Sequence, residues 1–172
     1  MTDDAATPSP ETPAAGGEDA AIGPGAPSIQ VLTQFIRDLS FENPNAPQSM
    51  SNPEAPGVEV EVELAARGRD DGLFELDMTL TVSAKRAEQT AFHVQLVYGG
   101  VFAIQGVPQE ALEPMLLVEC PRFLFPFARQ IIANVTTEGG FAPFRMEPLD
   151  FGAIYMARRS QALQEQPAVG NA

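Results

Sequence analysis

The chain has 172 residues, of which 44% are apolar and 8% aromatic, a size and composition that suit one domain with a buried core. Its 10 basic and 23 acidic residues give a net charge of −13, which repels phosphate backbones and anionic lipid headgroups. Nucleic acid and membrane surfaces are therefore not expected as partners, and the single cysteine excludes a disulfide within the chain.

Residues 1–27 are expected to form a disordered acidic tail rich in Pro, Ala and Gly. They contain five prolines, five acidic residues and no basic residue, so they cannot offset their ordering entropy by burying apolar surface. They also lack the regions of a signal peptide, and no run of 18 apolar residues follows, which predicts a cytoplasmic protein without membrane insertion. The folded domain is expected over 28–160 and a flexible C-terminal tail over 161–172.

Four stretches have the apolar pattern of strands. The first, SIQVLTQFIRDLSFE at 28–42, is apolar on both faces for part of its length. GVEVEVELA at 57–65 and LFELDMTLTVS at 73–83 alternate strictly, and RGRDDG at 67–72 joins them, which predicts an antiparallel hairpin with its carboxylates on one exposed face. The fourth is TAFHVQLVYGGVF at 90–102, where two glycines indicate a bend or bulge.

After these strands the apolar period becomes that of a helix. Pro114 should kink or delay a helix in PQEALEPMLLVEC at 108–120. PFARQIIANVTTEGG predicts a helix that begins at Pro126 and ends at two glycines, and DFGAIYMARRSQAL predicts a helix capped by Asp150. Strands followed by helices predict an α+β fold, with a four-stranded antiparallel sheet followed by C-terminal helices.

Cys120 and His93 are the only cysteine and histidine, and together they are the minimum parts of a thiol hydrolase. Catalysis would require a lowered thiol pKa, whereas the neighbouring Glu119 would raise that pKa and the apolar flanks suggest a packed thiol. A structural cysteine is favoured, and no enzymatic activity is expected. No metal and no cofactor are expected either, because a one-chain zinc site lacks ligands and the glycines form no phosphate loop.

Two surface features remain. A row of carboxylates along two predicted strands is either a solvated face or a docking face for a basic partner; it comprises Glu59, Glu61, Glu63, Glu75 and Asp77. The aromatic segments FLFPF at 123–127 and FAPF at 141–144 add to Met50, Phe92 and Tyr98 more apolar surface than a small fold hides. Oligomerisation, or a groove for extended apolar segments of another chain, would cover it.

Four motifs resemble SecB, the bacterial protein-export chaperone. They are DLSFENPNAP at 38–47, TAFHVQLVYGGVFAIQG at 90–106, CPRFLFPFAR at 120–129 and FAPFRMEPLDFGAIYM at 141–156. The likeness runs in order from about Ile29 to Arg159. It implies a cytosolic, ATP-independent, non-enzymatic homotetramer, a dimer of dimers, that binds unfolded preproteins, keeps them translocation-competent and delivers them to the SecA ATPase.

The resemblance also implies roles for individual residues. SecA docking is expected at Asp38 and Glu42 together with the carboxylate row, while His93 and Gln95 depart from the family pattern there. The client groove is expected at Phe41, Met50, Phe92, Phe141, Phe144, Phe151 and Tyr155, and subunit assembly at Val94, Leu96 and Tyr98. The alternative is an oligomeric scaffold or a small-ligand binding protein that uses the aromatic surface.

Overall fold

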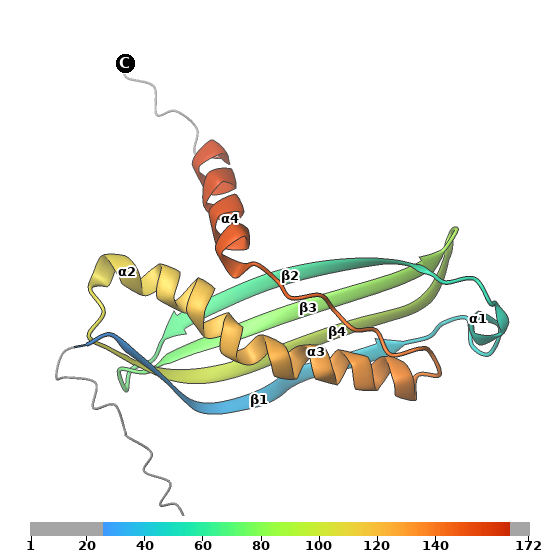
Figure 1. The fold of residues 1–172 in the computed structure, drawn as a ribbon, viewed down its shortest axis with the longest axis horizontal. Coiled ribbons are helices and arrows are strands. Elements are labelled where there is room, and N and C mark those ends of the chain that lie inside the picture. Colours follow the sequence, from blue (N-terminus) through green and yellow to red (C-terminus); the bar gives the residue numbers. More distant parts are fainter. Residues whose placement is uncertain (1–25, 166–172) are drawn as a thin grey trace, which may run out of the picture.

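A long four-stranded antiparallel sheet organises the chain in the computed structural model, which describes residues 26–165 (Figure 1). Its strands are β1 (Ser28–Glu42), β2 (Gly57–Gly68), β3 (Phe74–Arg86) and β4 (Gln89–Gln105). They lie in the order β1-β4-β3-β2, so β1 and β2 are the edge strands. The predicted α+β fold with four antiparallel strands is confirmed. The expected N-terminal tail lies almost wholly outside the described residues, as does 166–172.

The chain crosses from one edge of the sheet to the other between β1 and β2, through the short helix α1 (Gln48–Ser51). Arg86 fastens this crossing, because its guanidinium donates to the backbone carbonyls of Ser49 and Glu54 at 2.6 and 2.5 Å. Asn45 adds a hydrogen bond from its side-chain amide to the carbonyl of Thr90 at 2.9 Å. The crossing is thus tied to the β3–β4 hairpin.

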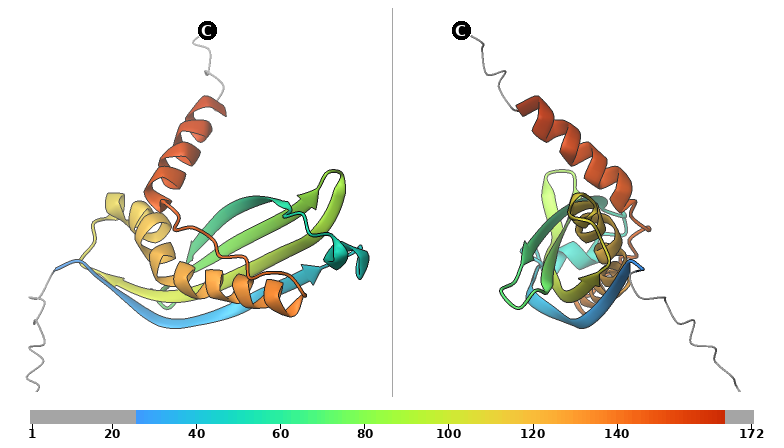
Figure 2. Two further views of the ribbon diagram at one scale, coloured as in Figure 1. Left: turned by 45° about the vertical axis from the view of Figure 1, so that its right-hand side comes forward. Right: turned by 90° about the vertical axis from the view of Figure 1, so that its left-hand side faces the viewer.

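The hydrophobic core lies between the sheet and the long helix α3 (Cys120–Glu138), which runs along one face (Figures 1 and 2). Alternate residues of β3 and β4 point toward this helix and are almost fully buried, as the period of two requires. The sheet contributes Leu76, Met78, Leu80, Val82, Val94, Leu96 and Phe102, and α3 contributes Leu124, Ala128 and Ile132.

The irregularities in the sheet lie in β1 and near the β3–β4 turn, between Ala84 and Lys85, and not at the two glycines of β4. The pairing of β1 with β4 shifts between Val31 and Thr33 and again between Ile36 and Asp38, which explains the apolar residues on both faces of the predicted strand. Gly99 instead makes room, since a Cβ there would lie 2.7 Å from a ring carbon of Phe35. The predicted bulge at the glycines is therefore wrong.

The helical region begins at α2 (Gln109–Pro114) as predicted, but its long helix α3 begins earlier than predicted. α2 passes through a π-helical turn, Met115–Glu119, directly into α3, and Figure 2 shows the bend between α2 and α3. The predicted start at Pro126 is wrong, because α3 begins at Cys120 and Pro126 lies inside it. Pro121 lies directly after the π-helical turn, in the first turn of α3, and Pro126 is on the exposed side of the helix.

The last helix, α4 (Phe151–Glu165), projects from the body of the subunit (Figures 1 and 2). Asp150 caps it as predicted, since its carboxylate accepts the backbone N–H of Ala153 at 3.0 Å. The helix continues to Glu165, so the flexible tail expected from 161 overlaps its final turn. Among the described residues, 26–165, none of the helices has the length and apolar character needed to cross a membrane.

Candidate binding surfaces

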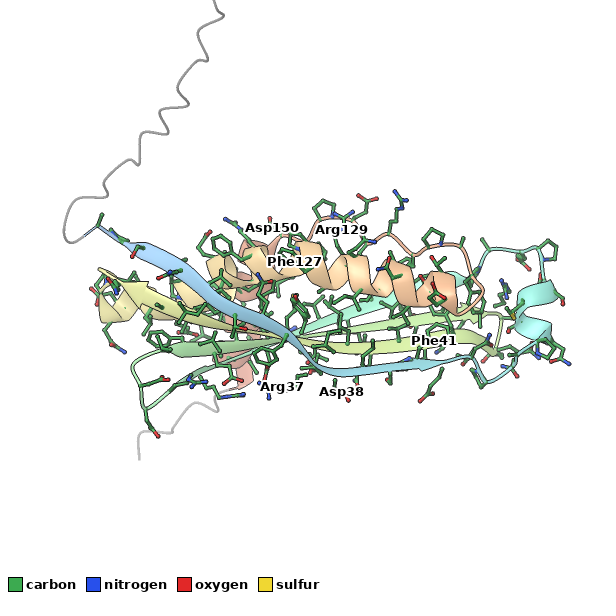
Figure 3. All side chains as sticks on the ribbon, turned by 90° about the horizontal axis from the view of Figure 1, so that it is seen from below. Arg37, Asp38, Phe41, Phe127, Arg129 and Asp150 are labelled. Carbon is green, nitrogen blue, oxygen red and sulfur yellow. The ribbon has the colours of Figure 1, made fainter. Side chains whose placement is uncertain are left out.

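The face of the sheet opposite α3 carries exposed carboxylates on its two edge strands. Pairing aligns Glu42 of β1 with His93, Ser83 and Glu59, and Asp38 with Val97, Thr79 and Glu63. Between these two rows of paired residues lies a third row, which ends in Glu61 on β2. Figure 3 shows Asp38 on the side of β1 away from α3, whereas Phe41 lies toward the helix.

These rows define the acidic face, which consists of Asp38, Glu42, Glu59, Glu61 and Glu63. All five side chains are exposed. The central strands between them present uncharged side chains, mainly threonine, serine, glutamine and valine. Two banks of negative charge therefore flank a polar strip that a basic partner could cover.

Glu75 and Asp77 do not belong to this acidic face, although the sequence predicted them on the exposed carboxylate row. They are 8% and 9% exposed, and Arg37 and Arg67 form ion pairs with both of them. The distances from the arginines to Asp77 are 3.0 and 3.2 Å. The expectation of exposure is wrong here because the bulge in β1 brings Arg37 over β3.

The guanidinium of Arg37 also lies 5.2 Å from the centre of the Phe35 ring, a cation–π contact. The hydrogen bond to Asp77 is the main cause of a raised pKa for Arg37, so this charge persists at every physiological pH. Arg37, Arg67, Glu75 and Asp77 are called the arginine cluster below. Its charges balance, so it gives the face little net potential.

His93 lies within the acidic face, and its ring is oriented by a partner. Its Nδ1 is 3.0 Å from the hydroxyl of Ser83 on the neighbouring strand. The distance between Ser83 and His93 is that of a catalytic Ser–His pair. Distance alone does not make such a pair catalytic, because catalysis also requires a group that stabilises an oxyanion. The two residues lie in the sheet surface beside Glu42 and Glu59.

The residues predicted for the client groove separate into two groups. At one end of the subunit, Phe41, Phe92 and Phe141 form an aromatic cluster with ring centres 4.9 to 6.5 Å apart. Met50 from the crossing segment is 49% exposed beside it. Close approach to Gly140 fixes its position, since a Cβ there would lie 2.0 Å from the methyl of Met50.

The second group lies under α4. Phe151 is 1% exposed and packs edge to face against Phe125, with ring centres 5.8 Å apart. Tyr155, also largely buried, lines a pocket of about 280 Å³ with Leu64, Leu117 and Ile154. Phe144 lies elsewhere, half-buried against the core, where its N–H donates to the Thr136 hydroxyl.

Burial limits which of these residues another chain could contact. Phe92 and Phe151 are almost inaccessible, at 3% and 1% exposure, so they support the apolar surface from beneath. Phe41 and Phe141 are half-buried and Met50 is exposed. Six of the seven predicted residues therefore fall into two separate apolar groups, and Phe144 belongs to neither.

Comparison with known proteins decides the family. The family model described as preprotein translocase subunit SecB matches residues 24–162. The protein-export protein SecB of Caulobacter sp. (strain K31) is 54% identical over the full length of both chains, and that of Caulobacter vibrioides (strain NA1000 / CB15N) is 51% identical over the full length of both.

The chain belongs to the SecB family. Its role is that of a protein-export chaperone, as the resemblance implied. A SecB-like chaperone of Mycobacterium tuberculosis, solved with a peptide from an antitoxin, has the same fold with a TM-score of 0.58 and 14% identity. The match covers 70% of this chain and 90% of that one.

The three residues predicted for assembly of the SecB tetramer lie inside the subunit. Val94 and Leu96 have no exposed surface and Tyr98 is 8% exposed, because this side of β4 faces α3. Burial also raises the pKa of the Tyr98 hydroxyl. Val94 and Leu96 have no surface to offer another subunit directly, and Tyr98 has little, so an influence of these residues on assembly would act mainly through the packing of β4 against α3.

Other apolar side chains are exposed on this SecB subunit. They lie on the β1 edge, at Leu32, Ile36 and Leu39, and on the outer side of α3, at Phe123 and Phe127. The exposed phenylalanines of α3 belong to FLFPF, which the sequence indicated as surplus apolar surface. The exposure of apolar side chains along β1 follows from its bulges and could not be predicted from the period of the strand.

Cys120 contributes no site. It is fully buried, and this burial, with a smaller effect of Glu119, raises its pKa to about 12. A protonated, inaccessible thiol is a poor nucleophile. Over residues 26–165, moreover, His, Cys, Asp and Glu do not gather into any group of three that could hold a metal ion.

Proposed function

We propose that this SecB chain is an ATP-independent, non-enzymatic holdase of the cytoplasm that binds unfolded precursor proteins and delivers them to SecA. The observation that carries the proposal is the division of one sheet into two faces. The acidic face lies on one side, and the aromatic cluster and the pocket under α4 belong to the other. Two kinds of partner can then bind at once.

The acidic face is the proposed docking surface for SecA. Its five carboxylates are exposed and are not consumed by ion pairs among the described residues, in contrast to Glu75 and Asp77. Exposed like charges raise the rate at which a basic partner arrives, and salt weakens the effect. We therefore assign docking to Asp38, Glu42, Glu59, Glu61 and Glu63, and a structural role to the arginine cluster.

The apolar sites are the proposed contacts for clients. Met50, Phe41 and Phe141 offer adaptable and aromatic surface at one end, and Tyr155 with Ile154 offers a second site under α4. Each contact is weak for a single apolar segment. Several sites on one assembly act together through effective concentration and hold a long unfolded chain tightly.

Assembly into a tetramer, a dimer of dimers, is part of the proposal. The exposed Leu32, Ile36 and Leu39 lie on an open strand edge, and Phe123 and Phe127 lie one helical turn apart on α3. Exposed edges and apolar stripes of this kind are normally covered by another chain. Four subunits would supply the repeated client sites that tight capture requires.

The test uses two charge-removing double variants. Asp38→Asn with Glu42→Gln should weaken SecA binding by at least about fivefold and leave capture of an unfolded preprotein unchanged. Glu110→Gln with Glu147→Gln removes the same charge at exposed positions outside both proposed binding surfaces and should change neither. Calorimetry with SecA and an aggregation assay with a denatured preprotein measure the two effects; unchanged SecA affinity in the first variant contradicts the assignment.

An oligomeric scaffold or a small-ligand protein is the competing function. Light scattering distinguishes it, because the holdase requires about four subunits and suppression of client aggregation at near-stoichiometric amounts. A protein that leaves client aggregation unchanged at tenfold excess is not a holdase.

A further inference from the structure

Helix α4 is held to the body of the subunit over little more than its first two turns. Phe151 and Tyr155 anchor the start of the helix, at 1% and 9% exposure. Arg158 is the last half-buried side chain, and those of residues 159–164 are all exposed. The direction in which the helix leaves the body therefore depends on what Arg158 contacts.

Among the described residues, the guanidinium of Arg158 forms its hydrogen bonds with backbone carbonyls. Its two terminal nitrogens donate to the carbonyls of Val62 and Leu64 in β2, at 3.1 and 3.2 Å. Carbonyls two residues apart in a strand leave it on the same side. Because β2 pairs only with β3 among residues 26–165, that side is the open edge of the sheet. The planar fork of a guanidinium suits two parallel acceptors of this kind.

We propose that Arg158 latches α4 across the open edge of β2, and that an extended apolar segment of a client must displace its guanidinium to bind there. The proposal rests on the client-binding function proposed above. It adds that Arg158 regulates access of a client to the edge of β2. A backbone N–H of an added strand would need the same carbonyls that Arg158 occupies, so the two are mutually exclusive.

The surroundings indicate which segments would compete. The pocket of about 280 Å³ beside this edge is lined by Leu64, Leu117 and Ile154, which suits an apolar side chain of the incoming strand. Glu61 and Glu63 are exposed along β2 and repel acidic segments. A neutral or basic apolar segment is therefore the occupant that fits. The released guanidinium would regain hydration in water, which keeps the barrier to opening low.

Peptide binding tests the competition. The probe is a fluorescent 12-residue peptide of alternating valine and threonine with two terminal lysines, compared with the same peptide N-methylated at alternate residues. Arg158→Ala should bind the unmodified probe about three- to tenfold more tightly than wild type and gain nothing for the methylated probe. Gln161→Ala, on the same helix, exposed and outside the pocket, should behave as wild type, and Arg158→Lys should fall between.

Hydrogen exchange of α4 tests the latch independently of any client. Arg158→Ala should accelerate exchange of the amides at 156–164, whereas Gln161→Ala should not. Unchanged exchange together with unchanged probe affinity overturns the proposal, and self-association of Arg158→Ala without tighter probe binding assigns the edge to a second copy and overturns it too. If wild type and all variants bind neither probe, the client-binding function is contradicted, and exchange alone decides whether Arg158 latches α4.

Discussion

At the scale of single residues, Cys120 shows how position overrides chemical type. The thiol lies at the first residue of α3 with no exposed surface, and its pKa of about 12 reflects burial first and Glu119 second. Free cysteines that are buried this way behave as small apolar side chains. The residue that suggested a nucleophile in the sequence is therefore part of the packing between helix and sheet.

The raised pKa of Cys120 predicts a loss of stability at alkaline pH. Between pH 9 and about 12 the thiol ionises in the unfolded chain but stays protonated in the folded one. The free energy of unfolding is therefore unaffected by this group below pH 9 and falls as the pH rises toward 12. The slope is at most about 1.4 kcal/mol per pH unit. Urea unfolding from pH 8 to 10.5 should show wild type losing more stability than Cys120→Ala. Parallel pH profiles would contradict the burial argument.

Gly99 predicts a second effect of a single side chain. A Cβ at this position would lie 2.7 Å from the Phe35 ring and 2.8 Å from a carboxylate oxygen of Asp77, which the arginine cluster holds in place. Gly99→Ala should lower the free energy of unfolding by about 1–3 kcal/mol through overpacking. Gly57→Ala is the control, because its nearest neighbour would be 3.8 Å away. Equal urea midpoints for the two variants would refute the crowding.

At the scale of elements, the strands could be predicted from the sequence far better than the helix boundaries. Strict alternation in 57–65 and 73–83 reports which face is buried, and the structure confirms it except at Val60, which is exposed, and at Glu75 and Asp77, which are buried. The bulges of β1 carry no such signal, since one extra residue leaves both faces apolar. Pairing of Arg67 with Glu75 follows from the register of the hairpin and could have been predicted, whereas Arg37 reaches the same carboxylate only through a bulge.

Pro126 misled the prediction of α3 because proline ordinarily begins a helix or breaks it. Here it lies on the exposed side of a helix that starts six residues earlier, so the helix tolerates one missing backbone hydrogen bond. The contacts of Arg158 and Arg86 with backbone carbonyls could not be predicted either. They join segments that are distant in the sequence, and no spacing indicates them.

Replacement of Pro126 tests this account of α3. If the helix is continuous through this position, Pro126→Ala restores a backbone donor without removing buried surface, and the free energy of unfolding should rise by about 1 kcal/mol or more. Thermal and urea unfolding measure the change. A fall in stability would instead favour a required junction at Pro126, as the sequence had predicted.

At the scale of the whole molecule, the sheet separates charge from apolar surface. α3 and the aromatic cluster cover one face, and the acidic face and the arginine cluster share the other. Within that outer face, the exposed carboxylates can act on a distant partner, whereas Glu75 and Asp77 are neutralised by arginines of the same chain. The two sets of acids should therefore respond differently to substitution.

The bank of glutamates on β2 tests this difference. Glu59→Gln, Glu61→Gln and Glu63→Gln combined should slow SecA association several-fold at low salt, flatten its dependence on salt and leave client capture and stability nearly unchanged, because the three side chains are exposed. Stopped-flow binding between about 20 and 300 mM salt measures the slope.

Glu75→Gln is the matched control for that experiment. It removes a buried carboxylate that Arg37 and Arg67 share, so it should cost about 1–2 kcal/mol of unfolding free energy, less than a fully buried pair because both arginines are partly exposed. It changes the net charge by one unit rather than three, at a position outside the acidic face, so its salt slope for SecA should stay much closer to that of wild type than the slope of the triple variant. A triple variant with the wild-type slope, or a Glu75→Gln slope as flat as that of the triple variant, would place docking outside the β2 bank.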